Sequence, residues 1–436
     1  MIRLSDIPHD VIRATGPPLK LSDDEEVMGK DRGAIPQRIL VYCHDLFGLG
    51  NVKRMLLFSH HLRQVYPQAD LLFIMGSSRI GMFDLPSRFD YIKLPEIKRD
   101  PSGSIASGVL DVETARIVRM RSEIILSAAE GFQPDLLIVD KKPFGAAGEL
   151  QPMLEQLPRH IPRILVCRDI LDAPDKTREE MRASGFANSI RSYYDQILIL
   201  GEQEIFDFGQ AYDLPADVDA RLAYCGYLAP LENPQPAENV RRNMGLDPMR
   251  PVVLATVGGG EDGESLLSMF AASAKQAKGA WQSVLVCGPN LPQPIYEQLS
   301  DFTAAEADIR LIRSTNDMAS LIHTSDVIVS MAGYNTVCGL MTSRKPCILI
   351  PRTEPSEEQL VRAKILYQRG LALSVSPDCS VNMLSGAIQF QLTTATRGLG
   401  ASFIRQSATA DRIAVAVSKT FAATQSPIDG DIPCSA

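Results

Sequence analysis

The chain has 436 residues, of which 45% are hydrophobic and 22% charged, and its formal net charge is −8. This composition predicts a globular protein with room for two or three domains and argues against a nucleic-acid-binding protein, which usually carries a basic excess. No run approaches the ~20 apolar residues of a membrane span, and the N-terminus lacks a signal-peptide core, so a cytoplasmic protein is expected.

The first part of the chain, in order, predicts an extension and then an α/β domain. Residues 1–35 are polar and prolines interrupt them without periodicity, which indicates a mobile extension. From 36 to 228, apolar strand-like runs alternate with helical patterns at 53–66 and 113–131. Strands this apolar are covered on both faces, which predicts a parallel, helix-flanked sheet. The strand-like runs are RILVYCH, ADLLFIMG, DLLIVD, RILVCRD and QILILG.

The second part repeats this pattern after a break. Residues 229–250 are rich in proline and asparagine and are interpreted as a linker. Strand-like runs recur over 251–400, a final helix is expected at 401–422, and 423–436 form a tail. The predicted fold class is α/β, with two doubly wound Rossmann-like domains that face each other across a cleft. Ligands bind beyond the carboxyl ends of the strands in such sheets.

The cysteines and histidines predict no metal site. The eight cysteines are scattered without a CxxC pair, and the six histidines show no ligand spacing. Buried, reduced thiols are therefore expected rather than disulfides or a metal centre.

Charged residues end several strands of the first domain. His44 and Asp45 follow the first strand and precede a glycine loop with Gly48 and Gly50. Other strands end in "DKK" at 140–142, "RD" at 168–169 and "GE" at 201–202. Together these residues predict a polar pocket, whereas any one of them is also explained as a cap or turn residue.

Two segments of the second domain carry further signals. Gly258, Gly259 and Gly260 follow a strand, and adjacent amides in such a loop can bind phosphate oxygens. The loop lacks the lysine and hydroxyl of a P-loop and the GxGxxG spacing of a dinucleotide site. In "SDVIVSMAGYNTVCGLMTSRKPCILIPRTEPSEEQLVRAKIL", a strand breaks at Ala332 and Gly333 before a helix that could hold a diphosphate.

Residues 325–371, with the loop at 258–262, resemble the glycosyltransferase family 28 C-terminal domain, whose best-known member adds N-acetylglucosamine to a lipid-linked peptidoglycan precursor. The segments "HDLFGLG", "KLPEI", "VDKKPFGAAGEL" and "RDILD" in the first domain resemble predicted bacterial glycosyltransferases. The resemblance implies the GT-B fold, with a nucleotide-sugar on the second domain and an acceptor on the first. It also implies a C-terminal helix that packs back on the first domain.

Site residues follow from the resemblance position by position. Donor binding is implied for Gly258, Gly259, Gly260, Ala332, Gly333, Asn335, Thr336, Glu358 and Gln359. Gly48 and Gly50 would form an acceptor-side phosphate loop, with Asn51, Lys53 and Arg54 beside it. Glu358 and Gln359 would face the donor sugar, and a capped, solvated helix start is the alternative interpretation of this segment.

Two positions depart from the family pattern. Relatives often have histidine where this chain has Asn51, and asparagine is no general base near neutral pH. Relatives also tend to have a ribose-binding glutamate where this chain has Gly339, and losing that acceptor would weaken donor binding by ~1–3 kcal/mol.

The expected activity is inverting, metal-independent transfer of a sugar, with a UDP-sugar as donor, to a glycan or lipid-linked acceptor. Inversion requires a base for the acceptor proton. His44 and Asp45 are the nearest candidates, with Asp140 and Asp169 as alternatives from other strand ends. No DxD motif stands in a suitable loop, so no metal or other cofactor is expected, and helix N-terminal amides would stabilise the leaving group.

Other interpretations remain open. A nucleotide-sugar hydrolase or epimerase could use the same fold, and Asn51 with Gly339 would also suit a degenerate, non-catalytic partner of another transferase. The apolar segment 80–86 is compatible with peripheral contact at the inner membrane face and with ordinary packing. Oligomeric state is not indicated.

Overall fold

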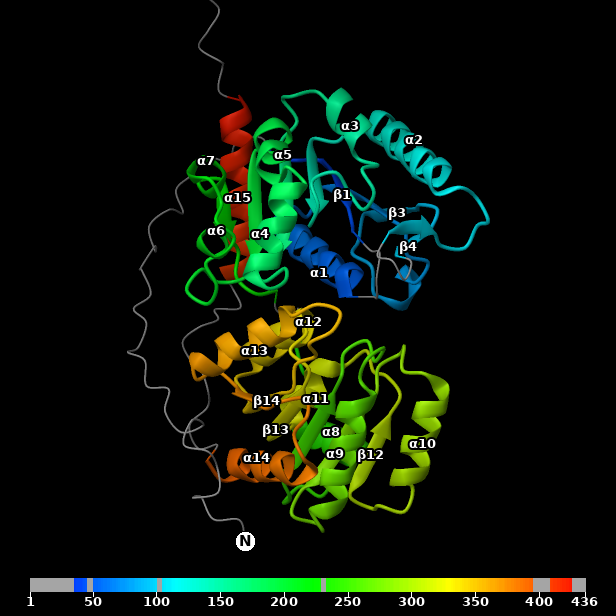
Figure 1. Ribbon diagram of the computed structural model, residues 1–436, viewed down its shortest axis with the longest axis vertical. Coiled ribbons are helices and arrows are strands. Elements are labelled where there is room, and N and C mark those ends of the chain that lie inside the picture. Colours follow the sequence, from blue (N-terminus) through cyan, green and yellow to red (C-terminus); the bar gives the residue numbers. More distant parts are fainter. Residues whose placement is uncertain (1–34, 45–49, 100–103, 229–232, 395–407, 426–436) are drawn as a thin grey trace, which may run out of the picture.

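The computed structural model describes residues 35–44, 50–99, 104–228, 233–394 and 408–425. Figure 1 shows two domains stacked along the long axis of the molecule, with α1 on one side of their junction and α12 and α13 on the other. The predictions for the extension at 1–35, and for Asp45, Gly48 and most of the tail, fall outside the described residues.

The first domain is built on a seven-stranded parallel sheet, as the apolar runs predict. β6 is buried along its whole length because helices cover the sheet. The sheet order is β3 (Phe89–Lys93), β2 (Asp70–Met75), β1 (Arg38–Tyr42), β6 (Leu136–Asp140), β7 (Arg163–Arg168), β8 (Gln196–Leu200) and β9 (Leu222–Tyr224).

Helices and a small hairpin complete this domain. The helices expected at 53–66 and 113–131 are confirmed as α1 (Gly50–Val65) and α2 (Thr114–Phe132). The hairpin pairs β4 (Ile97–Arg99) with β5 (Ile105–Ser107) in antiparallel fashion. The remaining helices are η3 (Ile80–Met82), α3 (Gln151–Gln156), α4 (Pro174–Ala183), α5 (Phe186–Tyr193), α6 (Phe208–Ala211) and α7 (Ala216–Asp219).

The second domain has a six-stranded parallel sheet. Its order is β12 (Ile309–Ile312), β11 (Gln282–Val286), β10 (Val252–Thr256), β13 (Val327–Ser330), β14 (Cys347–Leu349) and β15 (Leu373–Ser374). Its helices are α8 (Ala237–Asn243), α9 (Glu264–Gln276), α10 (Gln293–Thr303), α11 (Met318–Thr324), α12 (Tyr334–Ser343), α13 (Glu358–Gln368) and α14 (Val381–Thr394).

The segment interpreted as a linker, 229–250, contains a helix. α8 begins after Pro236, whose fixed φ suits a helix start, and it packs against α11. Val240 and Leu246 are buried in the hydrophobic core. The many polar residues of this segment thus concealed a helix and two apolar anchors.

The last helix returns to the first domain. α15 (Ala408–Gln425) occupies the described part of the expected range 401–422 and packs against α1 and β8. Figure 1 shows it in red beside first-domain helices, although α14 before it belongs to the second domain. Ile413, Val417 and Phe421 enter a hydrophobic cluster that runs through both domains. No helix in the described residues has both the length and the apolar character to span a bilayer.

Candidate functional site

The strand orders place the candidate site between the two domains. The order in which the chain adds strands reverses between β1 and β6 in the first domain, and between β10 and β13 in the second, although all these strands are parallel. Loops at such switch points diverge and leave a crevice beyond the carboxyl ends of the strands. The two edges meet, because the side-chain amide of Asn335 at the start of α12 donates to the carbonyl of Gly50 at the start of α1, at 2.8 Å.

On the first domain, Asp140 lies at the centre of a buried group. Its carboxylate accepts hydrogen bonds from the His44 amide at 3.2 Å and from Arg54 Nη2 at 2.7 Å. Arg54 also donates to the Asn51 side chain at 2.9 Å. The Asn51 side chain is thus engaged by Arg54, whereas Lys53 is exposed. In this conformation the Asp140 carboxylate is occupied and has no exposed surface.

His44 differs from Asp140 in having an unused polar atom. Its imidazole is almost fully buried, and Nδ1 has no hydrogen-bond partner among the described residues, which omit 45–49. Burial, and then the positive charge of Lys141, lowers the pKa of His44 well below its ordinary value of 6.5. The imidazole is therefore neutral near pH 7, and the same shift makes it a weaker proton acceptor than an exposed histidine.

Asp169, the other predicted acid, is also occupied. It accepts from Arg362 Nη2 at 3.2 Å and from the Tyr227 hydroxyl at 2.8 Å. Arg362 belongs to α13 of the second domain, so this ion pair crosses between the domains and is buried on both sides. The geometry favours a structural role for Asp169 over direct contact with a substrate.

On the second domain, the glycine loop packs tightly against the loop that follows β11 and also reaches α12. A Cβ built on Gly260 would lie 2.4 Å from the Cys287 carbonyl oxygen, and one on Gly288 would lie 2.6 Å from the Gly258 carbonyl oxygen. These distances exclude side chains and bring the two loops together backbone to backbone. A Cβ on Gly258 would lie 3.6 Å from Thr336 Oγ1, so the loop reaches the start of α12.

The structure also brings Gln359, which is expected to face the donor sugar, close to the start of α12. The Gln359 amide nitrogen lies 3.9 Å from the place that a Cβ on Gly333 would occupy. Ala332 accepts a hydrogen bond on its carbonyl from Arg362 Nη1 at 2.9 Å. Gly258, Ala332, Gly333, Thr336 and Gln359 are therefore grouped at one edge of the second sheet.

Glu358 is engaged by cations rather than free in the cleft. It forms ion pairs with Arg168 of the first domain and, at 3.7 Å, with Arg352. Burial by itself would raise the pKa of Glu358, but the nearby arginines lower this pKa below its ordinary value. Gln359 Oε1 accepts from the Arg352 amide at 3.3 Å.

Lys141 adds a further positive charge at this edge. It follows β6 directly, and its backbone has the left-handed φ of +67°, which is uncommon for a residue with a side chain. Burial and then Arg168 and Arg54 lower the pKa of Lys141 to about 8. The described residues therefore place Lys141, Arg168 and Arg352 near one carboxylate, that of Glu358.

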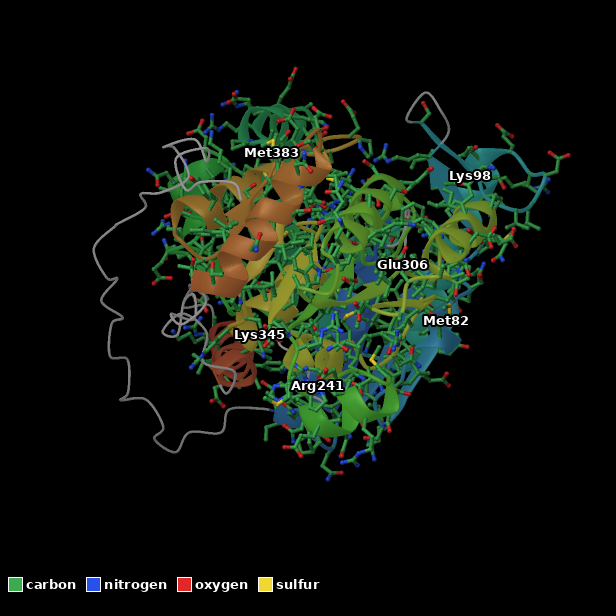
Figure 2. The ribbon with its side chains drawn as sticks, turned by 90° about the horizontal axis from the view of Figure 1, so that it is seen from below. Met82, Lys98, Arg241, Glu306, Lys345 and Met383 are labelled. Atoms are coloured by element: carbon green, nitrogen blue, oxygen red, sulfur yellow. The ribbon has the colours of Figure 1, made fainter. Side chains whose placement is uncertain are left out.

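An open cavity of about 600 Å³ lies where further loops of the two domains meet. Arg79 of the first domain bonds to the Asn290 side chain, which in turn donates to Glu261 at 2.9 Å. Figure 2 shows Met82, which lines this cavity, on the same side of the molecule as Lys98 of the hairpin. The lining residues are Arg79, Met82, Glu261, Pro289, Asn290 and Leu291.

Sequence reasoning gave no role to several residues that organise the site: Tyr227, Tyr334, Arg352 and Arg362. Tyr334 directly follows the predicted Ala332–Gly333 turn, and Arg362 stands one helical turn after Gln359, so both were within reach of the motif. In the described part of the chain, no group of three His, Cys, Asp or Glu side chains is placed to hold a metal ion.

Comparison with known proteins gives this geometry a family context. Residues 253–397 match the glycosyltransferase family 28 C-terminal domain. An uncharacterized glycosyltransferase of Methanopyrus kandleri is 25% identical over 174 residues, which cover 39% of this chain and 46% of that protein. The UDP-N-acetylglucosamine–N-acetylmuramyl-(pentapeptide) pyrophosphoryl-undecaprenol N-acetylglucosamine transferase of Natranaerobius thermophilus is 30% identical over 100 residues, covering 22% and 27%. The chain thus spans less than half the length of these curated relatives.

Solved structures show the same fold over most of the chain. Acinetobacter baumannii MurG has a TM-score of 0.54 at 12% identity, covering 88% of this chain and all of that one. Phytolacca americana UGT2, in complex with UDP-2fluoro-glucose and pterostilbene, has a TM-score of 0.56 at 13% identity, covering 88% and 99%. At these identities the likeness concerns the fold, which is GT-B as expected.

Proposed function

We propose that this chain, in which residues 253–397 form a glycosyltransferase family 28 C-terminal domain, is a glycosyltransferase that moves a sugar from a nucleotide-sugar to a glycan or lipid-linked acceptor. The observation that carries the proposal is the meeting of α1 and α12, start to start, beside the glycine loop at 258–260. Helix N-termini and loop amides suit a diphosphate because their N–H groups point at the anion.

The donor diphosphate would lie against the Ala332–Gly333 turn and the start of α12, with Thr336 and the glycine loop beside it. Gln359 would contact the transferred sugar, and a UDP-sugar is the donor we favour. A role in sugar binding is less direct for Glu358, because its carboxylate forms ion pairs with Arg168 and Arg352. It would reach a sugar hydroxyl only after that contact rearranged.

Transfer would proceed with inversion in one displacement. The acceptor oxygen attacks the anomeric carbon from the face opposite the diphosphate, and the bond from that carbon to the diphosphate oxygen breaks with its electron pair. A base takes the acceptor proton. We favour His44, whose imidazole is neutral and whose Nδ1 has no partner among the described residues, over Asp140 and Asp169, whose carboxylates are held in ion pairs. Asp45 remains a candidate outside the described residues.

Metal-independent catalysis is supported by the cations that line this edge. Lys141, Arg168 and Arg352 come from both domains and surround the carboxylate of Glu358, and Arg352 also pairs with Asp262. Fixed positive charges can stabilise the negative charge that develops on a leaving diphosphate without rearranging during the reaction.

The first experiment is a thermal-stability panel with UDP, GDP, dTDP, CDP and their common sugar conjugates. A ligand that binds only the native state raises the melting temperature, by an amount that grows with concentration over Kd. We expect one nucleotide family to stabilise the protein, and Thr336→Val to weaken that effect. Thr342→Val, at the other end of α12, is the matched control.

The outcomes separate the competing functions. Transfer to an acceptor, undiminished by EDTA and with an inverted anomeric product by NMR, supports the proposal. Release of free sugar without an acceptor would favour the hydrolase reading. A well-folded protein that binds none of these nucleotides would favour a non-catalytic partner protein, with Gly339 as the first residue to restore to glutamate.

A further inference from the structure

The two domains are joined by a buried network centred on Arg362 of α13. Its Nη1 donates to the carbonyl of Ala332, in the turn before α12, at 2.9 Å, and its Nη2 donates to Asp169 of the first domain at 3.2 Å. Both charged side chains are buried to 1% exposure or less. One guanidinium thus bonds at the same time to the predicted donor turn and to the opposite domain.

Asp169 is fixed on its other side by the segment that leaves the first domain. The hydroxyl of Tyr227 donates to Asp169 Oδ2 at 2.8 Å, so both carboxylate oxygens are engaged. Burial, followed by Asp169, raises the pKa of Tyr227 well above 10, which keeps this hydroxyl protonated as a donor. The carboxylate is therefore held in place before any ligand binds.

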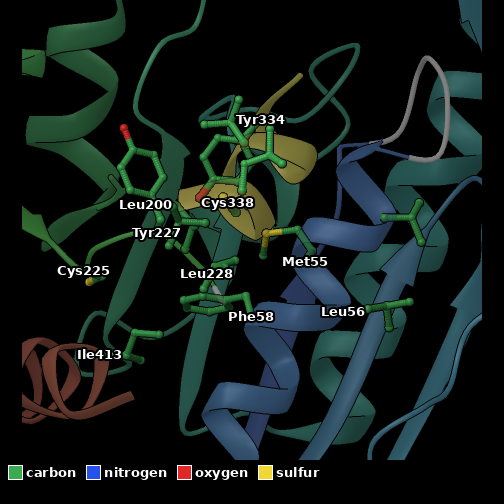
Figure 3. Close-up of a cluster of buried hydrophobic side chains, with 14 of the residues drawn as sticks. Met55, Leu56, Phe58, Leu200, Cys225, Tyr227, Leu228, Tyr334, Cys338 and Ile413 are labelled. Carbon is green, nitrogen blue, oxygen red and sulfur yellow. The ribbon is translucent and has the colours of Figure 1, made fainter. Parts of the chain in front are cut away.

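The ring of Tyr334, the first residue of α12, lies near two buried arginines. The guanidinium carbon of Arg54 is 6.0 Å from the ring centre and that of Arg362 is 5.7 Å from it. Figure 3 shows Tyr334 and Cys338 of α12 packed with Tyr227, Leu228 and Met55 of the first domain. The start of α12 is therefore held by charge and by apolar packing.

The contact at the cavity is of another kind. Arg79 and Asn290 are joined by an exposed hydrogen bond. Exposed polar contacts contribute little to stability, whereas breaking a buried ion pair leaves an uncompensated charge. Among the contacts between the domains, the Arg362–Asp169 pair and the Arg79–Asn290 bond should therefore differ widely in how easily they open.

We propose that Arg362 and Asp169 are positioning residues, which set the Ala332–Gly333 turn and the start of α12 against the first domain, while the domains separate first at the Arg79–Asn290 contact. The sugar donor would then meet a turn that domain contact has already fixed. The placement of the turn does not depend on the proposed activity, so it can be tested without a substrate.

Hydrogen exchange of the full chain, followed by mass spectrometry, tests the first part. In Asp169→Asn we expect amides at 337–340 of α12 to exchange at least 10-fold faster, while those of α9 in the same domain keep their wild-type rate. Asp213→Asn, in the exposed Arg182–Asp213 pair, is the matched control. Unchanged exchange in α12, or an equal increase in α9 and α12, would overturn the positioning role.

Two further variants keep the positioning role testable if Asp169→Asn misfolds, and test whether the domains open first at the Arg79–Asn290 contact. If Asp169→Asn fails to fold, Tyr227→Phe removes a single hydrogen bond and should produce the same local effect. Arg79→Ala should increase the radius of gyration in X-ray scattering and leave exchange in α12 unchanged. Identical scattering in Arg79→Ala and wild type would contradict opening at this contact. If no nucleotide binds to the wild-type protein, the proposed function fails, but these readouts are unaffected.

Discussion

Arg54 Nη2 and Asp140 Oδ1 lie 2.7 Å apart in the interior of the first domain, although 86 positions separate the two residues in the chain. Both side chains are buried. Burial by itself would lower the pKa of Arg54, but the Asp140 carboxylate raises this pKa above its ordinary value. The pair fixes α1 to the end of β6, where the His44 amide shares the same carboxylate. An acid that the sequence suggests as a base is thus a counterion in the structure.

Asp140→Asn should strongly destabilise the protein, because it leaves the Arg54 charge buried without a partner. Breaking a buried pair in this way removes about 3–5 kcal/mol from the free energy of unfolding. Urea denaturation measures the change. The exposed pair Arg182–Asp213 supplies the control, since Asp213→Asn should change stability by at most about 1 kcal/mol. Equal effects in the two variants would contradict the structural role.

His44 should make stability fall at acid pH. Its folded-state pKa lies well below 6.5 because of burial and then Lys141, so below about pH 6.5 the unfolded chain binds a proton that the folded chain does not. The free energy of unfolding then decreases by up to about 1.4 kcal/mol per pH unit. His44→Asn should flatten the profile between pH 7.5 and 5.5, and His323→Asn, at an exposed position, should not.

Lys141 should react with amine reagents ahead of exposed lysines near pH 8. Its pKa of about 8 makes a large share of the side chain neutral and nucleophilic at that pH. Brief acetylation followed by mass spectrometry can compare Lys141 with Lys98, which is exposed on the β4–β5 hairpin. We expect faster modification of Lys141 and protection by UDP if UDP occupies the cleft. Slower modification of Lys141 than of Lys98 would count against this prediction.

Gly339→Ala should stabilise the protein by about 0.5–1 kcal/mol, because glycine inside a helix costs conformational entropy. There is room for the added methyl group, since its nearest neighbour would be Ile322 Cδ1 at an ordinary 3.5 Å. Gly288→Ala is the contrast. Its φ is +86° and a Cβ would lie 2.6 Å from backbone atoms, so this variant should lose stability. The melting temperatures of both variants, compared with that of the wild type, test this prediction, and a lower melting temperature for Gly339→Ala would contradict it.

Ile413→Ala should lower the free energy of unfolding by about 2–5 kcal/mol, because it leaves a cavity in a buried cluster. Val415 lies two residues further along α15 and is 46% exposed, so Val415→Ala should change stability by no more than about 0.5 kcal/mol. Chemical denaturation of the two variants would measure how far α15 supports the first domain. Similar small effects would mean that α15 contributes little.

Much of the architecture could be predicted from local patterns in the sequence. A run such as DLLIVD is apolar at successive positions, and only a strand covered on both faces suits such a run. The two parallel sheets, the glycine loop at 258–260 and the break at Gly333 followed from such patterns. The burial of Val240 in α8 and of Leu246 just after it could not be predicted in this way, because both are isolated apolar residues among polar ones.

The sequence by itself thus determined the two α/β domains and the edge of each sheet at which a ligand would meet them. The tertiary structure alone decided what the charged residues at those edges do. Asp169 and Arg362 stand 193 positions apart, and Asn335 and Gly50 stand 285 apart. Local periodicity reports which side of an element is buried, whereas the partner of a buried charge depends on how distant elements pack. For that reason the sequence could nominate Asp140 and Asp169, and only the folded chain could show them held by arginines.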